Sequence, residues 1–200
     1  MKKIQSLIFL SLLFSGYSFS QSFDDGTNLV FIGFGIPPAE RITNDFNQLY
    51  KKYIDYKLNN YGTFELKYEH GLHKYFGLGL NMEYSAASVS YKYDDINTLR
   101  YERKIKANVW GFYARLNGHV PVLDKLDLYG GVGLGYLYTI NKYDDTNPNP
   151  NVNIKQKQTI LDFDYQFTIG ARFMVKEGIG LFVEGGWATT PAQIGVVMKF

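Results

Sequence analysis

The sequence predicts an all-β fold, an eight-stranded antiparallel up-and-down transmembrane β-barrel. Three observations lead to this expectation: apolar and polar residues alternate over eight segments, a short apolar segment opens the chain, and the connections between the eight segments are long at one end and short at the other. Alternation with a period of two places apolar side chains on one face of a strand and polar side chains on the other. A membrane barrel needs only one apolar face per strand.

The N-terminus has the pattern of an export signal. A basic start precedes an apolar stretch over residues 7–14, and the small residue Ser20 stands where a cleavage point is expected. The apolar stretch is far shorter than the roughly 20 residues that a membrane-spanning helix needs. We therefore predict a cleaved signal peptide over residues 1–20, with the cut before Gln21, and one β-barrel domain over residues 21–200.

Charge and cysteine content exclude several classes of protein. The chain has 21 Lys and Arg against 19 Asp and Glu, and two of the lysines lie in the predicted signal peptide, so the remainder is neutral. This balance offers no basic surplus for nucleic acid, and we expect no nucleic-acid partner. Because the chain has no cysteine, disulfides and thiolate metal sites are excluded. A closed, hydrogen-bonded barrel is one way to hold such an exported chain together.

The clearest alternation runs over residues 161–173. Phe163, Tyr165 and Phe167 share one face there, while polar residues such as Gln166 occupy the other. The same period recurs along the chain, and an even number of antiparallel strands returns the C-terminus to the side of the N-terminus. The eight predicted strands fall within residues 28–36, 61–71, 76–91, 110–117, 128–138, 161–173, 181–187 and 194–200.

The connections between strands set the orientation of the barrel. At one end they are about 24, 12 and 17 residues long, with a short fourth connection over residues 188–191, whereas at the other end they are turns of about 4 to 7 residues. Long extracellular loops and short periplasmic turns are typical of bacterial membrane barrels. Both ends of the barrel domain are therefore expected on the turn side, in the periplasm.

Charged residues on the polar face decide between a membrane barrel and a soluble barrel. A soluble eight-stranded barrel has its apolar face inside, around a ligand, whereas a membrane barrel has it outside. Eight strands enclose only enough room for side chains, so the large aromatic residues fit better outside and the mixed charges fit better inside. We predict a structural ion-pair network in the lumen, formed by Glu65, Lys67, Glu69, Glu83, Arg115, Asp162, Asp164, Arg172, Glu184 and Lys199.

The last strand resembles the insertion signal of outer-membrane barrels. Residues 194–200 alternate and end on Phe200, the pattern that the barrel-assembly machinery reads. Residues 21–200 as a whole resemble the small outer-membrane β-barrel group typified by outer membrane proteins A, X and W. The resemblance implies the outer membrane of a Gram-negative bacterium, contact with outer-membrane lipid and lipopolysaccharide, and the assembly machinery as a partner during insertion. It brings no active-site motif, and we expect a monomer.

Candidate catalytic and metal-binding residues do not assemble into a known motif. The three histidines, His70, His73 and His119, lack the spacing of a metal site and are expected at the membrane interface or in the lumen. They fall toward the turn end, whereas Ser85 and Ser88 fall toward the loop end, and a strand of ten residues separates these ends by about 33 Å. We therefore expect no enzyme, no cofactor and no metal.

Two features of the loops call for an interpretation. Residues 92–97 and 142–147 repeat the pattern Lys-Tyr-Asp-Asp-x-Asn, which is typical of turn-forming residues. The paired carboxylates could instead bind Mg²⁺ or Ca²⁺ together with lipopolysaccharide phosphates. In the first loop, Phe46, Leu49 and Tyr50 have helical spacing and predict a short amphipathic helix over the barrel mouth.

The sequence predicts function less closely than fold. The leading hypothesis is a structural, adhesion or surface-interaction role through the extracellular loops, with a surface partner that the sequence does not identify. The alternative is a narrow pore or a hydrophobic-ligand conduit, and a lipid-modifying enzyme is the third hypothesis. Packing of the lumen distinguishes the first two, because a lumen filled by paired side chains would not conduct ions.

Overall fold

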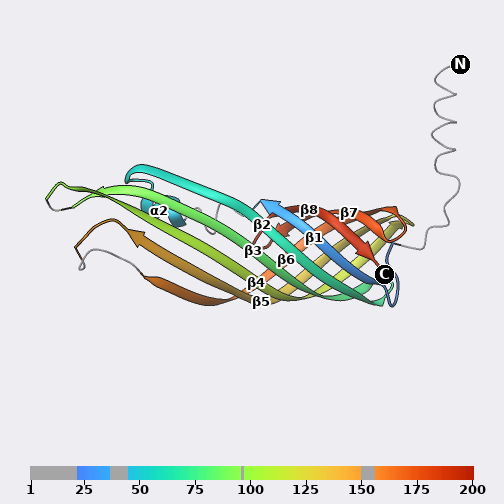
Figure 1. Ribbon diagram of the computed structural model, residues 1–200. Helices are drawn as coiled ribbons and strands as arrows, with labels where there is room; N and C mark the ends of the chain where they lie inside the picture. The colour runs from blue at the N-terminus through green and yellow to red at the C-terminus, as the bar shows by residue number, and fades with distance from the viewer. Residues whose placement is uncertain (1–21, 37–44, 96, 150–155) are drawn as a thin grey trace, which may run out of the picture.

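Eight antiparallel strands form a closed ring in the computed structural model, which describes residues 22–36, 45–95, 97–149 and 156–200. Each strand pairs with its neighbours in the sequence, and the last strand pairs with the first (Figure 1). The predicted eight-stranded up-and-down barrel is thereby confirmed, whereas the predicted signal peptide lies outside the described residues. The elements are β1 (Asn28–Ile36), α2 (Asp45–Tyr50), β2 (Ile54–His73), β3 (Phe76–Asp94), β4 (Arg100–Leu123), β5 (Leu126–Asp145), β6 (Lys157–Lys176), β7 (Ile179–Trp187) and β8 (Ala192–Lys199).

The strands fall into two length classes. β1, β7 and β8 have 9, 9 and 8 residues, close to the 9 to 11 residues or so that a tilted strand needs to cross a bilayer. β2 to β6 have 19 to 24 residues, and at about 3.3 Å per residue the longest reaches about 80 Å, well beyond a hydrocarbon core of about 30 Å. All eight strands therefore enclose only one end of the molecule, and five continue beyond it (Figure 1).

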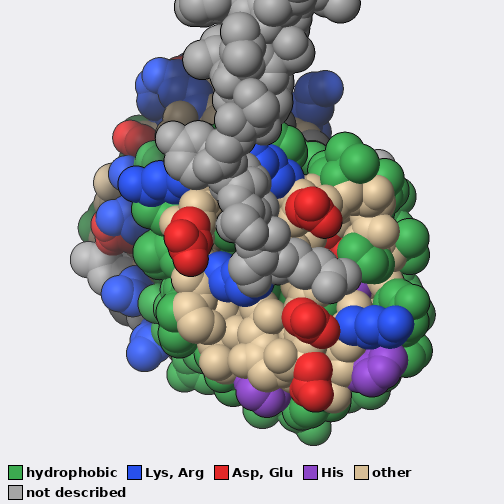
Figure 2. All heavy atoms as spheres, turned by 90° about the vertical axis from the view of Figure 1, so that its right-hand side faces the viewer, with side chains coloured by type: hydrophobic (Ala, Val, Ile, Leu, Met, Phe, Trp, Pro, Cys, Tyr) green, Lys and Arg blue, Asp and Glu red, His purple; other side chains and the backbone are tan. Residues whose placement is uncertain are grey.

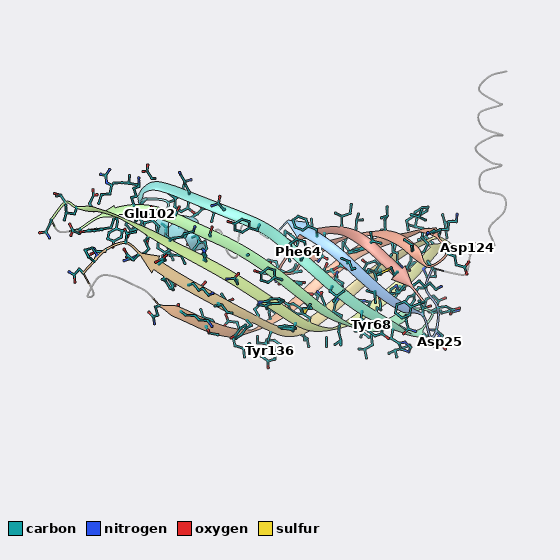
Figure 3. The ribbon with its side chains drawn as sticks, in the orientation of Figure 1. Asp25, Phe64, Tyr68, Glu102, Asp124 and Tyr136 are labelled. Atoms are coloured by element: carbon teal, nitrogen blue, oxygen red, sulfur yellow. The ribbon has the colours of Figure 1, made fainter. Side chains whose placement is uncertain are left out.

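We call the ring of eight strands the closed barrel and the continuing part of β2 to β6 the sheet extension. The extension comprises residues 54–62, 86–94, 100–108, 140–145 and 157–159, which pair with one another beyond the ends of the short strands. Figure 3 marks the two ends of the molecule, with Asp25 and Asp124 at the turn end and Glu102 at the far end of the extension.

Turns and loops are shorter than the sequence suggests, because the long strands run further than their alternation indicates. The three turns at the closed end have only two residues each, at 74–75, 124–125 and 177–178. The second loop, expected at about 12 residues, is confined to residues 95–99 between β3 and β4. Much of what looks like loop sequence is therefore paired strand in the extension.

A β-bulge marks the point where β2 leaves the closed barrel. The pairing of β2 with β3 shifts register between Asn60 and Thr63, and Thr63 is the last residue of β2 paired with β1. Gly62 lies inside this shift with a φ of +82°, and a Cβ at this position would collide with the ring of Phe34. A bulge with glycine in a left-handed conformation bends the strand, so β2 turns away from β1 where β1 ends.

The closed barrel is apolar outside and polar inside. Its outward side chains are large and exposed, for example Phe167 at 54 % and Leu134 at 60 %, while its inward ones are buried and polar. Viewed from the turn end, hydrophobic side chains ring the outside (Figure 2). Tyr136 and Tyr68 both lie outward at the barrel wall (Figure 3).

The two faces exchange character in the sheet extension. On the inner side, Val89, Tyr91 and Ile105 are buried and pack against Phe46 and Tyr50 of α2. The predicted amphipathic helix is thus present and covers the inner side of the extension. On the outer side of the same strands, polar residues such as Ser90, Lys104 and Lys106 replace the apolar residues of the barrel. Since apolar side chains avoid water, the exchange indicates that the outer surface meets lipid at the closed barrel and water at the extension.

Candidate functional site

An ion-pair cluster crosses the middle of the lumen. The Glu184 carboxylate accepts hydrogen bonds from Lys67 Nζ at 2.7 Å and from Arg115 Nη1 at 2.9 Å. Lys67 Nζ also lies 3.0 Å from Glu65 Oε1, and Arg115 Nη2 donates to Thr168 Oγ1 at 2.6 Å. All four charged side chains are buried. Because they come from β2, β4 and β7, they tie separate parts of the wall together across the bore.

A second cluster of charges lies toward the turn end. His119 Nε2 is 2.8 Å from Glu69 Oε1, and His119 Nδ1 is 2.8 Å from Asp127 Oδ2. Arg172 Nη2 donates to the same Asp127 oxygen at 2.6 Å, and Asn117 Nδ2 donates to Glu69 Oε1 at 2.8 Å. Both imidazole nitrogens therefore face carboxylate oxygens, an arrangement that fits a doubly protonated ring donating twice.

An apolar layer packs against this cluster and reaches the level of Lys67, which is paired with Phe31. The ring of Phe23, from the segment that precedes β1, stacks on His119 with 3.7 Å between centroids and 15° between planes. Two backbone hydrogen bonds fix this segment to β2, from Gly26 N–H to Gly71 O and from Gly71 N–H to Thr27 O. The buried apolar residues of the layer are Phe23, Leu29, Phe31, Met174, Phe182 and Val197.

The loop end of the lumen is filled by uncharged polar groups around two carboxylates. Glu83 Oε1 accepts hydrogen bonds from Asn81 Nδ2 and Gln166 Nε2, both at 2.7 Å. Tyr113 OH donates to Asp164 Oδ2 at 2.8 Å. These side chains are buried, so polar or apolar side chains fill the lumen along its described length.

Inward-facing glycines make room for the charged side chains. A Cβ on Gly77 would collide with the Glu69 carboxylate, and a Cβ on Gly131 would collide with the Asn117 amide and come within 2.7 Å of Arg115 Nη2. Glycine weakens a strand, yet a larger residue at either position would displace a member of the network. Glycine on one strand therefore leaves the space that a large charged or polar side chain of the neighbouring strand fills.

The structure places eight of the ten predicted network residues in the buried lumen and two elsewhere. Asp162 is exposed: β7 ends at Trp187, which pairs with Phe167, so no wall faces β6 at the level of Asp162. Lys199 is half-buried at the last position of β8. The buried eight are Glu65, Lys67, Glu69, Glu83, Arg115, Asp164, Arg172 and Glu184.

Two members of the network, His119 and Asp127, were missing from the ten predicted residues, although the lumen was one of the two places expected for the histidines. His119 and Asp127 lie on either side of the β4–β5 turn, and sequence alone places them at a turn, where charged residues are ordinary. The spacing along each strand could have predicted their place. His119 and Arg115 are separated by an even number of residues, as are Asp127 and Tyr129, so a period of two puts all four side chains on the inner face.

The end of the chain has the geometry of a barrel strand. Phe200 N–H donates to Asn28 O at 3.0 Å and Asn28 N–H donates to Phe200 O at 3.3 Å. The Phe200 side chain is 72 % exposed and continues the outward row of β8. Its role as an insertion signal stays a prediction.

The core of the sheet extension contains one buried carboxylate. Asp145 accepts hydrogen bonds from Arg103 Nε at 2.7 Å, from Tyr93 OH at 3.0 Å and from the Asn147 backbone N–H at 2.9 Å. Burial opposes ionisation of Asp145, but the Asn147 N–H and the Arg103 guanidinium outweigh it and hold the pKa of this carboxyl below its usual value. The extension thus has a charged anchor in addition to its apolar core.

Three stacked tyrosines connect the first loop to the extension. Tyr91 stacks with Tyr50 at 4.9 Å and with Tyr53 at 4.6 Å between centroids. Burial raises the pKa of Tyr91 to about 12, so its hydroxyl is neutral at physiological pH. The stack makes the described end of the first loop, around Tyr50 and Tyr53, part of a packed structure.

The repeated Lys-Tyr-Asp-Asp segments end β3 and β5, and the last aspartate of each segment caps the turn that follows. Asp95 Oδ1 accepts the backbone N–H groups of Asn97 at 2.8 Å and Leu99 at 2.9 Å, and Asp145 accepts that of Asn147. This supports the turn explanation over a cation site. Within the part of the chain that the structure describes, no group of three or more His, Asp or Glu side chains is arranged to bind a metal ion.

Serine and histidine side chains stay apart. Ser85 Oγ is hydrogen-bonded to Thr63 Oγ1 at 2.6 Å, and His119 is engaged by Glu69 and Asp127 at the other end of the lumen.

None of the described helices combines the length and apolar character needed to cross a membrane.

Comparisons with known proteins agree with this architecture. The sequence model of a family described as "Outer membrane protein beta-barrel domain" matches residues 7–194. Among solved structures, outer membrane protein OprG of Pseudomonas aeruginosa is similar with a TM-score of 0.52 and 13 % identity, over 90 % of this chain and 99 % of that one. The attachment invasion locus protein Ail of Yersinia pestis aligns with a TM-score of 0.40 and 12 % identity, over 88 % and 95 % of the two chains. No curated protein sequence matches.

Proposed function

Because this chain belongs to the outer membrane protein beta-barrel family, we propose that it is a non-enzymatic surface protein whose sheet extension binds partners while its closed barrel serves as a sealed membrane anchor. The observation that carries the proposal is the continuation of β2 to β6 far beyond the ends of β1, β7 and β8. A barrel that only anchors itself or only conducts ions does not need strands of twice the membrane-spanning length.

The internal packing of the extension supports a role in recognition. A mobile loop loses entropy when it orders on binding, whereas this region has its own apolar core, its stacked tyrosines and the buried Asp145–Arg103 pair. Such packing holds the exposed outer side chains in place before a partner arrives. A preorganised surface of this kind suits adhesion or another contact at the cell surface.

The filled lumen disfavours a pore. Buried charges of both signs bridge the middle, and the apolar layer around Phe23 closes the turn end. Moving an ion through would require breaking pairs such as Lys67–Glu184 in a region of low polarity, which is costly. We infer that the wild-type protein conducts ions poorly or not at all.

One observation favours a conduit for hydrophobic ligands as a second candidate. Above the pair Phe167–Trp187, β6 has β5 on one side and no strand on the other, so the ring opens sideways above this pair. The groups beneath the opening are polar, however, including Tyr113, Asp164 and Thr189. This polar floor suits a hydrophobic ligand poorly, so we place this function second.

A lipid-modifying enzyme has less support. Acyl transfer or hydrolysis requires a nucleophile with a base within hydrogen-bond reach. Ser85 is engaged by Thr63, and the buried carboxylates are engaged in the lumen network. The proposal therefore assigns no catalytic residue.

Removal of the tip of the extension tests the surface role. Ser90 and Lys104 are paired across β3 and β4, so deleting residues 91–103 and joining them through a two-residue turn preserves the register below. Whole cells that display this variant should lose attachment to surfaces coated with fibronectin, laminin or collagen, or to one another, relative to cells that display the wild type. A matched insertion of the same two-residue turn at 124–125, on the turn side, should leave attachment unchanged.

Two results would count against the proposal. Attachment that is equal for wild type, variant and empty cells would remove the surface role. Uptake of a hydrophobic substrate that depends on the chain and survives removal of the tip would promote the conduit instead. Folding of each variant is checked by its heat-dependent migration on a gel.

A further inference from the structure

Three lysines line up in direct register on the outer face of the sheet extension. Lys106 is paired with Lys142, and Lys142 is paired with Lys157. All three side chains are exposed. Directly opposite residues on one face have Cβ atoms about 4.5 to 5.5 Å apart, so three positive charges fall within about 10 Å. We call Lys106, Lys142 and Lys157 the lysine row.

Such a row is unfavourable for the isolated protein. Like charges directly opposite each other on neighbouring strands are destabilising. No ion pair of the described residues includes a member of the row, whereas two cations farther out on the same face are paired, Lys92 with Asp55 at 2.8 Å and Arg100 with Asp94 at 2.9 Å. Asp144 is the one carboxylate facing the neighbouring Lys104. The cations nearest the closed barrel therefore lack the compensation that the outermost ones have.

The position of the lysine row relative to the membrane indicates which anion offsets its positive charges. On the same outer face and the same three strands, the row Trp110–Tyr138–Leu161 is the last one that is apolar or aromatic throughout, and the row Asn108–Ile140–Thr159 follows it. Four residues further along each strand lies the lysine row, about 13 Å away at the usual rise per residue. Lys106, Lys142 and Lys157 are the first charged residues met on this face.

We propose that the lysine row binds the phosphate groups of lipopolysaccharide in the surrounding outer leaflet. Aromatic side chains prefer the headgroup level, so a row just beyond them reaches the phosphorylated sugars that the leaflet carries. Because the row lies on the face that continues the lipid-facing surface, the anion comes from the membrane beside the barrel and not from a partner above it. This inference is independent of the surface role of the extension.

The test uses the folded full-length chain in detergent micelles and fluorescently labelled lipopolysaccharide, read by anisotropy. The test variant is the triple substitution Lys106→Gln, Lys142→Gln and Lys157→Gln. A lysine near an anionic surface changes affinity about fivefold (about 1 kcal/mol), so the triple variant should bind roughly a hundredfold more weakly.

The control variant removes the same charge elsewhere on the extracellular side, through Lys51→Gln, Lys52→Gln and Lys92→Gln. Its affinity should stay near that of the wild type. Lipopolysaccharide stripped of phosphate should bind the wild type and the row variant equally weakly. Folding is checked by heat-dependent gel migration, and removal of repelling charges should not impair it.

Three outcomes would overturn the inference. The first is a row variant that retains the wild-type affinity. The second is an equal loss of affinity in the row and control variants, which would indicate a general effect of net charge. The third is that heparin, a soluble polyanion without lipid, binds the wild type as tightly as lipopolysaccharide does and loses binding in the row variant. The last result would assign the row to a soluble ligand and contradict a membrane source.

Discussion

The closed barrel and the sheet extension are made by the same strands with opposite faces. Along β4, the inward Arg115 is buried among charges in the closed barrel, while the inward Ile105 is buried among apolar residues in the extension. The outward Phe112 is 50 % exposed in the barrel, and the outward Lys106 is exposed in the extension. The outward residues of one strand are therefore apolar where lipid surrounds the strand and polar where water surrounds it.

The comparison explains why the two parts are stabilised differently. In the closed barrel the backbone ring leaves no free edge, and the lumen is held by paired charges whose loss exposes other buried charges. In the extension, an apolar core and one buried pair hold five strands that have two free edges. Changes to charge should therefore act most strongly on the barrel, and changes to apolar volume should act locally on the extension.

Truncation of Arg115 should have the largest effect. Arg115→Ala leaves Glu184 with only Lys67 as a cationic partner, and breaking a buried pair typically costs about 3 to 5 kcal/mol. We expect a lower unfolding midpoint in urea and the appearance of single-channel current in planar bilayers, where the wild type shows little. Arg103→Ala, which breaks a pair in the extension, is the control and should leave conductance low. A large, stable current from the wild type would refute the sealed lumen.

A cation on the lipid-facing surface should have the next largest effect. Phe167→Arg places a charge against the hydrocarbon core, at a cost of about 2 to 4 kcal/mol near the midplane, and should reduce insertion into vesicles. Thr159→Arg changes an outward residue of the same strand in the extension, where water is expected, and should insert normally. If the two variants inserted equally well, the assignment of the two outer surfaces would be wrong.

A small cavity in the extension should act locally. Ile105→Val removes one methylene from the core beneath α2, and such changes cost about 0.5 to 1.5 kcal/mol. Amide hydrogen exchange should accelerate in β3 and β4 of the extension and stay unchanged in the closed barrel. Ile169→Val is the matched control, since Ile169 is 75 % exposed on the lipid side and leaves no internal cavity. Faster exchange throughout the barrel would show that the two parts unfold together.

Acidification should weaken the extension slightly. Because the pKa of Asp145 is lowered in the folded protein, its ionised form contributes stability above the unfolded pKa of about 3.9. That contribution is lost as the pH falls through the carboxyl range toward the folded pKa. Hydrogen exchange near Tyr93 should therefore rise at acid pH in the wild type and become less pH-dependent in Asp145→Asn. An equal pH response in both proteins would remove Asp145 as the titrating group.

The closed barrel was predictable because its alternation is strict. Phe163, Tyr165 and Phe167 share a face with no exception, so the outward face of β6 follows directly from the sequence. The placement of Asp162 was wrong because alternation gives the face of a residue but not its register with the facing strand. β7 ends at Trp187, as its alternation predicts, but Trp187 pairs with Phe167, so β7 stops short of Asp162 and leaves it exposed.

The sheet extension was harder to recognise because apolar and polar residues still alternate there, but the apolar residues lie on the inner face and not on the outer one. Val89 and Tyr91 are apolar on the inner face, where Asn81 and Glu83 are polar. An apolar pattern followed along one face alone therefore stops at this exchange, and the rest of the strand resembles a loop. The lysine row depends on register between distant segments, which no single segment contains. Comparing the phase of alternation along each strand could have found the inversion, whereas the register required the structure.

The most direct test of the two-solvent account is a scan of solvent exposure along the outer face of β4. The chain contains no cysteine, so single cysteines at Lys104, Lys106, Phe112 and Leu116 can each carry a spin label in the folded protein in lipid vesicles. We predict that relaxation by oxygen dominates at Phe112 and Leu116, and that relaxation by a water-soluble nickel complex dominates at Lys104 and Lys106. Oxygen-dominated relaxation at all four positions, or nickel-dominated relaxation at Phe112, would contradict the account.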